Sequence, residues 1–287
     1  MNGRMINMRA RQAMPGNWGT AIVIVFLIQV IQGTVSSLFQ IPIFLARFMN
    51  TVRLMEAGGQ GFSFGEQGMP NIVFETRDLY QFSILGLVSA IVLALLSTVF
   101  SAYQAYAFQA PIRGRKLTIE EGVNSMRETG VMRAVKTALR VMIFSFLWSL
   151  LFVIPGIVKS YAYSQALYLV RDRRNMTPRE ALQESQDLMR GRKGMLFGLH
   201  LRYMVLPLLI IIVMITLGAI GVTMLVMENM TGFLFFLPIF LGILALIILS
   251  YYIGVMIQVV NAAFYETLLE ETGRKQIYTD SRARYEA

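Results

Sequence analysis

Four long runs of the sequence contain no Asp, Glu, Lys or Arg, and they decide the class of protein. The runs span residues 12–46, 79–112, 203–227 and 229–265, and they hold 35, 34, 25 and 37 residues. About 20 consecutive apolar residues are enough for a helix to cross a bilayer. Only 15% of all residues are charged, whereas soluble domains carry about 25%. The sequence therefore predicts a polytopic membrane protein and excludes a soluble enzyme, a disordered chain and a secreted disulfide scaffold.

The basic residues are gathered between the apolar runs. Three precede Trp18, seven lie in 113–140, seven lie in 171–193 and four follow residue 273, whereas segment 47–78 has three basic and four acidic residues. Because cytoplasmic loops are enriched in Lys and Arg, we expect both termini in the cytoplasm and loop 47–78 outside. Basic segments beside anionic lipid also account for the net charge of +9 without nucleic acid as a partner.

The stretch 141–170 is harder to place, because its thirty residues carry a single charge, Lys159. As one helix it would be about 45 Å long, which exceeds the ~30 Å hydrocarbon core. Pro155-Gly156 is expected to break it into two short helices, about 141–154 and 157–171. These helices either cross the membrane as a hairpin, for six spans in total, or form a re-entrant hairpin that does not cross.

Two cytoplasmic segments begin with the same helix-start signal. Thr177–Glu180 and Thr118–Glu121 each place Thr at the N-cap and Glu three residues later, which is the capping-box pattern. The amphipathic helices that follow are expected to end at Gly191 and Gly130, because glycine is favoured just after a helix. A shorter N-terminal helix is expected to end before Gly16. Each of the three segments precedes a pair of apolar stretches.

We therefore expect an all-α fold, a polytopic transmembrane helix bundle of about six spans in one membrane domain, residues 1–287. Its internal organisation is a repeat of three units, each an interfacial amphipathic helix followed by a transmembrane hairpin. The units span 1–112 with the external loop 47–78, 113–172 with the Pro155-Gly156 break, and 173–287 with a cytoplasmic tail.

Several stretches resemble one known family. They are Ala10–Met14 leading into Gly16-Asn17-Trp18, Ile154–Ser164, Ala181–Ser185 with Met189 and Gly191, and Ala263–Glu266. Together they look like the bacterial integral-membrane family catalogued as domain of unknown function 975. More distantly, they are similar to the membrane domain attached to some glycerophosphodiester phosphodiesterases. The resemblance implies a multi-span protein of the bacterial cytoplasmic (inner) membrane, and it carries over neither an assigned chemistry nor the phosphodiesterase activity.

Seven polar side chains near the ends of the apolar stretches are candidate ligand-binding residues: Lys159, Tyr161, Tyr163, Gln104, Gln165, Asn261 and Arg202. Lys159 either extends its ammonium to the interface, with the tyrosines in the aromatic belt, or faces the bundle to hold an anionic head group. The three amides either line a common site near the cytoplasmic end or join neighbouring helices. Arg202 is expected to pair with Glu266 or Glu270 or to reach the lipid phosphates.

We expect no catalytic residue, metal or cofactor, and hence no enzyme. The chain has no cysteine and a single histidine, His200, which excludes thiolate and multi-histidine metal sites. The sequence shows no Ser, His and Asp residues that would come together as a catalytic triad. The paired acids Glu120-Glu121 and Glu270-Glu271 fit a helix cap and a helix surface. The glycine-rich segment 58–65 lacks the Lys-Ser/Thr of a phosphate-binding loop and is expected to be a flexible external loop.

The predicted function is the binding or handling of membrane lipids or membrane-active amphiphiles. A small permease or transporter component is one alternative, and it predicts an interior cavity lined by the amides or Lys159. A scaffold or accessory subunit is another, with a protein partner at loop 47–78 or at the basic cytoplasmic loops. A lipid-handling protein predicts a groove open sideways to lipid, and a scaffold predicts neither cavity nor groove.

Overall fold

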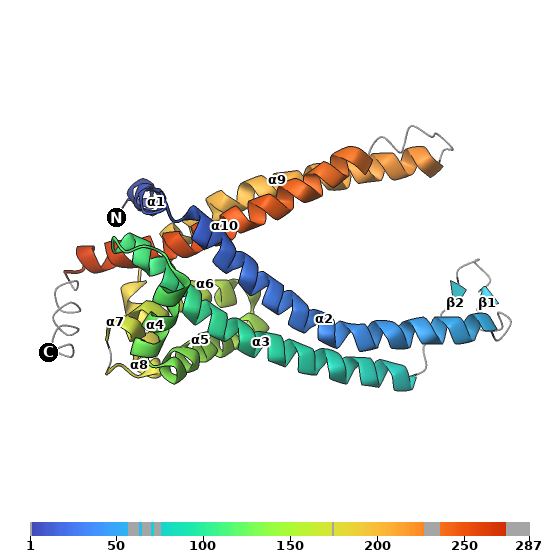
Figure 1. The fold of residues 1–287 in the computed structure, drawn as a ribbon, viewed down its shortest axis with the longest axis horizontal. Coiled ribbons are helices and arrows are strands. Elements are labelled where there is room, and N and C mark those ends of the chain that lie inside the picture. The colour runs from blue at the N-terminus through green and yellow to red at the C-terminus, as the bar shows by residue number, and fades with distance from the viewer. Residues whose placement is uncertain are drawn as a thin grey trace. The chain divides into compact units, whose positions relative to one another are not determined.

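The structure, a computed structural model, describes residues 2–56, 63–64, 70–71, 76–173, 175–226 and 236–273. These residues are almost entirely helical, as predicted, apart from the two-residue strands β1 (Ser63–Phe64) and β2 (Pro70–Asn71), which pair antiparallel. The helices, shown in Figure 1, are α1 (Gly3–Gln12), α2 (Trp18–Glu56), α3 (Thr76–Ile112), α4 (Ile119–Thr129), α5 (Val131–Leu151), α6 (Val153–Tyr163), α7 (Ala166–Asp172), α8 (Pro178–Leu188), α9 (Lys193–Val226) and α10 (Phe236–Glu271).

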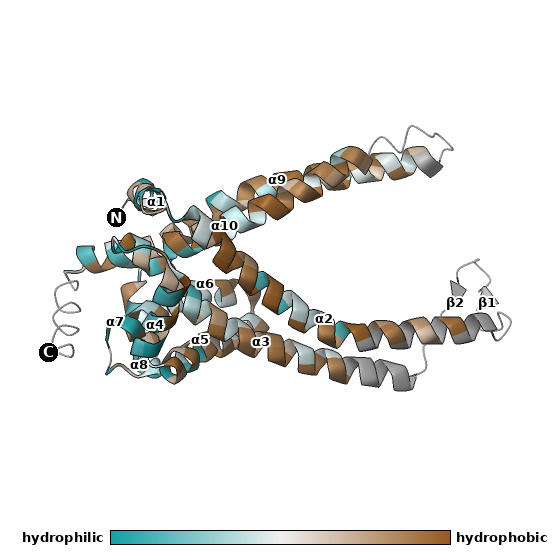
Figure 2. Ribbon diagram, in the orientation of Figure 1, coloured by the Kyte–Doolittle hydropathy of each residue, from teal (hydrophilic) through white to brown (hydrophobic). Residues whose placement is uncertain are grey.

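Five of the described helices, α2, α3, α5, α9 and α10, are long and apolar enough to cross a membrane. In Figure 2 the long helices are mostly brown, whereas the short helices α1, α4 and α8 carry much of the hydrophilic teal. A polytopic helix bundle is therefore confirmed as the fold class. The cytoplasmic placement of the termini and the identity of the membrane stay predictions.

The chain divides into two compact units, one of residues 1–26 with 98–287 and one of residues 27–97. The second unit holds the later part of α2, both strands and the first part of α3. Segment 47–78 is therefore helical at both ends, because α2 continues to Glu56 and α3 begins at Thr76. Of the glycine-rich segment 58–65 only β1 lies within the described residues.

In the first unit α9 and α10 run side by side (Figure 1). The N-terminal helix α1 packs on both, with the Tyr203 hydroxyl donating to Asn7 Oδ1 at 2.6 Å and Arg9 pairing with Glu270 at 2.9 Å. The end of α3 is fully or almost fully buried and rich in small residues, Ala102, Ala105, Ala107 and Ala110. Small side chains let helix backbones approach closely, which is how helices associate in lipid.

The predicted break in 141–170 exists, but not where the sequence placed it. Helix α5 ends and α6 begins on either side of Phe152, whose backbone is extended at φ −156° and ψ 137°. Pro155 lies in the first turn of α6. A backbone N–H in the first turn has no partner within the helix, so the lack of one in proline costs no helical hydrogen bond. A second interruption, at Ser164 and Gln165, separates α6 from α7. The expected helices 141–154 and 157–171 are therefore wrong in their bounds.

The predicted helix starts and ends on the short helices are confirmed. Thr177 and Glu180 form a complete capping box at α8, and the Thr118 hydroxyl accepts from the Glu121 N–H at α4. The three glycines expected to end these segments, Gly16, Gly130 and Gly191, all have positive φ, between 75° and 88°. That conformation strains residues with a side chain, so glycine at these positions fixes where each helix ends.

Candidate functional site

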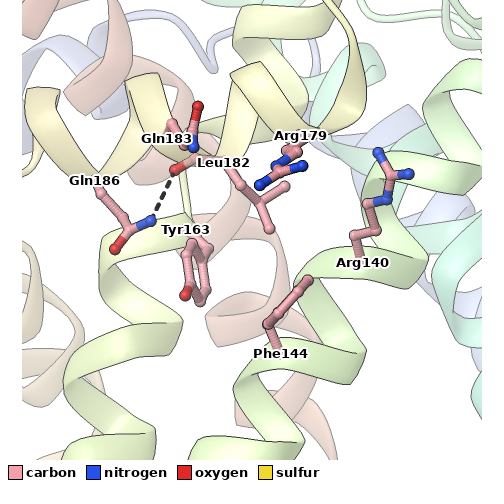
Figure 3. A pocket seen from close by; sticks show the side chains of 7 residues that line it. All are labelled: Arg140, Phe144, Tyr163, Arg179, Leu182, Gln183 and Gln186. Carbon is pink, nitrogen blue, oxygen red and sulfur yellow. Dashed lines mark hydrogen bonds between the residues drawn. The ribbon is translucent and has the colours of Figure 1, made fainter.

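The seven candidate residues do not form one site. Tyr163 lines a pocket between α5, α6 and α8, and Lys159 is bonded to Gln186 of the same lining. Tyr161 and Asn261 belong to a separate polar chain. The remaining three make other contacts, described below. The pocket has a volume of about 380 Å³ and is lined by Arg140, Phe144, Tyr163, Arg179, Leu182, Gln183 and Gln186 (Figure 3).

Two arginines give the pocket its charge. Arg140 comes from α5 and Arg179 from the first turn of α8, and both side chains are exposed. In the part of the chain that the structure describes, neither guanidinium has an ion-pair or hydrogen-bond partner, and no carboxylate lines the pocket. In Figure 3 the Arg179 guanidinium lies across the side chain of Leu182, the Arg140 guanidinium lies further to the right, and the ring of Phe144 lies below Leu182.

Lys159 adds a third cation at the edge of this pocket. Its ammonium donates to Gln186 Oε1 at 3.0 Å and lies 4.9 Å from the ring centroid of Trp148. The ring of Tyr163 lies 6.0 Å from the same nitrogen. Aromatic faces and an amide oxygen therefore hold Lys159 in place without neutralising it, because none of these groups carries a negative charge.

The carboxylates closest in sequence to the pocket arginines are engaged elsewhere. Glu180 accepts from the Thr177 N–H at 2.8 Å, and this hydrogen bond lowers the pKa of the Glu180 carboxyl. Glu184 pairs with Arg173 at 3.7 Å, and Asp187 pairs with Arg190 at 3.2 Å. The lining of the pocket thus keeps an uncompensated positive charge.

The family described as "Protein of unknown function (DUF975)" matches residues 72–272. The chain belongs to this family. The matched segment contains α3 to α10 and every residue of the pocket. No curated protein and no solved structure matches the chain. The more distant similarity to the membrane domain of glycerophosphodiester phosphodiesterases stays a prediction.

Within the family's segment, Tyr161 and Asn261 are joined through the single histidine. The Tyr161 hydroxyl lies 3.1 Å from His200 Nδ1, and His200 Nε2 lies 2.9 Å from Asn261 Oδ1. If Nε2 carries the proton, Tyr161 donates to the ring and the ring donates to Asn261, so all three groups are satisfied. The chain connects α6, α9 and α10, which is the role of a bond between helices.

Of the other two amides, only Gln104 joins neighbouring helices. Gln258 Nε2 donates to Gln104 Oε1 at 2.7 Å, which connects α10 to α3. Gln165 is fully buried, and its side-chain Nε2 donates to the adjacent Ser164 Oγ at 2.9 Å, while its Oε1 has no hydrogen-bond partner among the described residues. Its backbone N–H, not its amide, contacts α8 by donating to Ser185 Oγ at 3.2 Å. Gln104, Gln165 and Asn261 therefore lie in three different contacts and do not surround a common site.

For Arg202, one of the two expected arrangements was an ion pair with Glu266 or Glu270, and the structure gives both carboxylates other partners. The Arg202 side chain is exposed, and it forms no ion pair within the described residues. The two carboxylates proposed as its partners bind other arginines, since Glu266 pairs with Arg113 at 2.6 Å and Glu270 pairs with Arg9 at 2.9 Å. The predicted pairing of Arg202 is therefore wrong.

A buried ionic cluster that the sequence interpretation missed lies where α3, α7 and α10 meet. Arg113 holds Asp172 through two hydrogen bonds of 3.0 and 2.7 Å and also binds Glu266 at 2.6 Å. Burial alone would lower the pKa of Arg113, but the two carboxylates outweigh it and raise that pKa above its ordinary value. The guanidinium therefore stays charged at any pH at which the protein would be studied.

The second arginine of this cluster, Arg171, is almost completely buried. It donates to the Tyr106 carbonyl at 2.8 Å, to Gln109 Oε1 at 2.9 Å and to Ser125 Oγ at 2.7 Å. The sequence carried one usable signal: Arg113, Arg171 and Glu266 are each the first charged residue after a long apolar stretch. Their partners lie 46 or more positions away, so local spacing could not identify the pairs.

Proposed function

We propose that the protein binds an anionic, phosphate-bearing head group of a membrane amphiphile in the pocket lined by Arg140 and Arg179, without catalysing a reaction on it. The observation that carries this proposal is that two guanidinium groups line one pocket with no carboxylate in its lining, and neither has an ion-pair partner among the described residues. Like charges that share a pocket repel each other, and a bound anion removes that repulsion.

The chemistry of the two arginines suits phosphate. A guanidinium is planar, always charged and able to donate two parallel hydrogen bonds to one phosphate group. Lys159, held at the edge of the pocket by Gln186, adds a compact third charge. A head group with one or two phosphate oxygens directed at these cations would leave its glycerol portion against the lining residues Phe144 and Leu182.

The surroundings of the pocket favour an amphiphile over a small soluble anion. Phe144 is 44% exposed, and Leu147, one turn further along α5, is 49% exposed. Apolar side chains left exposed in this way are compatible with acyl chains. A lipid whose head group occupies the pocket would therefore extend its acyl chains along α5 toward Phe152, where α5 meets α6.

The permease alternative receives less support. It predicts an interior cavity lined by the amides or Lys159, yet Gln104 pairs with Gln258, Asn261 pairs with His200, and Lys159 is bonded to Gln186. Neither these amides nor Gln165 lines the pocket between α5, α6 and α8. The membrane lipids therefore remain the proposed partners, and no nucleic acid is proposed.

Native mass spectrometry of the detergent-extracted protein tests the proposal. We expect wild-type protein to retain phosphatidylglycerol and the Arg140→Gln/Arg179→Gln variant to lose at least about tenfold in affinity, since each charged hydrogen bond contributes about 1.5–3 kcal/mol. Lys159→Met is expected to weaken binding less. Inorganic phosphate added as a competitor separates a lipid site from a site for the free anion.

The matched control removes the same charge elsewhere. Arg127→Gln/Arg190→Gln also deletes two exposed arginines, and neither residue lines the pocket. This variant is expected to bind phosphatidylglycerol as the wild type does. Equal losses in both double variants would mean that net charge attracts the lipid, and an unchanged affinity in the pocket variant would overturn the proposal.

A further inference from the structure

Although α5 as a whole is long enough to span a bilayer, the charge-free arms of the α5–α6 hairpin are each too short to do so. The charge-free part of α5 is Val141–Leu151, and α6 is Val153–Tyr163, so each arm holds 11 residues. At 1.5 Å per residue each arm is about 16 Å long, roughly half of the ~30 Å hydrocarbon core. The rest of α5 carries Arg133, Lys136 and Arg140, which are costly to bury in lipid.

The base of the hairpin is fixed to a polar helix. Lys159 of α6 donates to Gln186 of α8 at 3.0 Å, and Ser185 of α8 donates to the Ala162 carbonyl of α6 at 2.7 Å. The outer face of α8 carries exposed charged side chains, so this helix cannot lie in hydrocarbon. Lys159 is therefore close to the water-facing level, and Phe152, seven residues earlier, extends only about 10 Å deeper.

The tip of the hairpin is apolar and exposed. Its residues Leu150, Leu151, Phe152, Val153 and Ile154 are 69%, 65%, 68%, 70% and 75% exposed. A turn in water is normally built from Gly, Asn, Asp, Ser or Pro, whereas five consecutive exposed hydrophobic side chains would be unfavourable there. The tip thus has the composition of a surface that faces acyl chains.

The backbone at the tip also suits hydrocarbon. An unwound residue at membrane depth is tolerated where its polar groups are satisfied within the protein. The Phe152 N–H donates to the Trp148 carbonyl at 3.1 Å, and the Phe152 carbonyl accepts from the Gly156 N–H at 3.0 Å. Pro155, in the first turn of α6, has no N–H to satisfy.

From these observations we infer that α5 and α6 form a re-entrant hairpin, which enters from the α8 side and ends with Leu150–Ile154 among the acyl chains near the bilayer midplane. The hairpin occupies one leaflet and does not cross. Of the described helices, only α2, α3, α9 and α10 then cross the membrane, and this even number places α1 and the end of α10 on the side of α8. The inference rests on the lengths, contacts and exposure of the hairpin and not on the proposed lipid pocket.

Spin-label depth measurements in liposomes test the inference directly, because the natural chain has no cysteine. The label is attached to Phe152→Cys, with Ile212→Cys in the middle of α9 as the deep control and Arg190→Cys as the water control. For Phe152→Cys we expect oxygen collisions as frequent as for Ile212→Cys. Collisions with a water-soluble nickel complex should be at least about tenfold rarer than for Arg190→Cys, because hydrocarbon excludes polar solutes.

A hairpin that crosses the membrane would expose the label on Phe152→Cys to water on the far side. A label on Phe152→Cys that the nickel complex reaches as readily as the label on Arg190→Cys would overturn the inference, and so would labelling of Phe152→Cys by an impermeant maleimide added to intact cells. Should Phe152→Cys fail to fold, Ile154→Cys serves as the second variant, since its side chain is the most exposed of the tip.

Discussion

Replacing Asp172 with alanine is expected to destabilise the fold by about 3–5 kcal/mol, the usual loss when one partner of a buried ion pair is removed. The Asp172 side chain is only 6% exposed, and its carboxylate accepts two hydrogen bonds from Arg113 and one from the Tyr265 hydroxyl at 2.9 Å. Without it, Arg113 keeps Glu266 as its remaining carboxylate partner, and the buried Tyr265 hydroxyl loses its acceptor.

The free energy of unfolding can be measured by titration with sodium dodecyl sulfate in mixed micelles, and Asp187→Ala is the matched control. Asp187 is also an aspartate paired with an arginine, but the Arg190 and Asp187 side chains are 84% and 64% exposed. An exposed pair of this kind contributes at most about 1 kcal/mol. Similar losses in the two variants would mean that the Arg113–Asp172 pair is not buried in the folded protein.

This cluster also marks a limit of inference from sequence. Three features could be predicted because they are local patterns: the long apolar runs, the two threonine caps and the glycine helix ends. In each of them the residues that matter lie within a few positions of one another. Arg113 and Asp172 are 59 positions apart, and Arg113 and Glu266 are 153 apart. Only the packing of α3, α7 and α10 brings them together, so the sequence showed these three charges near the ends of apolar stretches but not their pairing.

The candidate pocket was predictable only in part, for a related reason. Lys159 was predictable as a candidate because it is the single charge in a long apolar stretch, and the structure places it at the pocket's edge, bonded to Gln186. Arg140 and Arg179 were not identified as candidates, because the positive-inside rule already explains basic residues in such segments. What distinguishes these two arginines is that no carboxylate of the described residues lines their pocket, and such a gap is visible only when the neighbouring helices are in place.

Helix α6 lies so close to α5 that one added methyl group is expected to disturb the hairpin. A Cβ at Gly156 would overlap the Ser149 hydroxyl and would lie only 2.6 Å from the Ser149 Cα. The hydroxyl could rotate, but the backbone atom cannot move without shifting α5. Small residues at such positions let helices pack closely in lipid, and overpacking of a tight contact costs about 1–3 kcal/mol. Gly156→Ala is therefore expected to lose stability in this range.

The same titration measures this loss, with Gly194→Ala as the control. Gly194 also lies in a helix, α9, but a Cβ there would meet nothing within 4 Å. Its replacement is expected to be neutral or to stabilise by up to about 1 kcal/mol, because alanine is the better helix former. Since a displaced α6 would carry Lys159 away from Gln186, Gly156→Ala should also weaken phosphatidylglycerol binding. Unchanged stability in Gly156→Ala would show that α5 and α6 do not touch at this point.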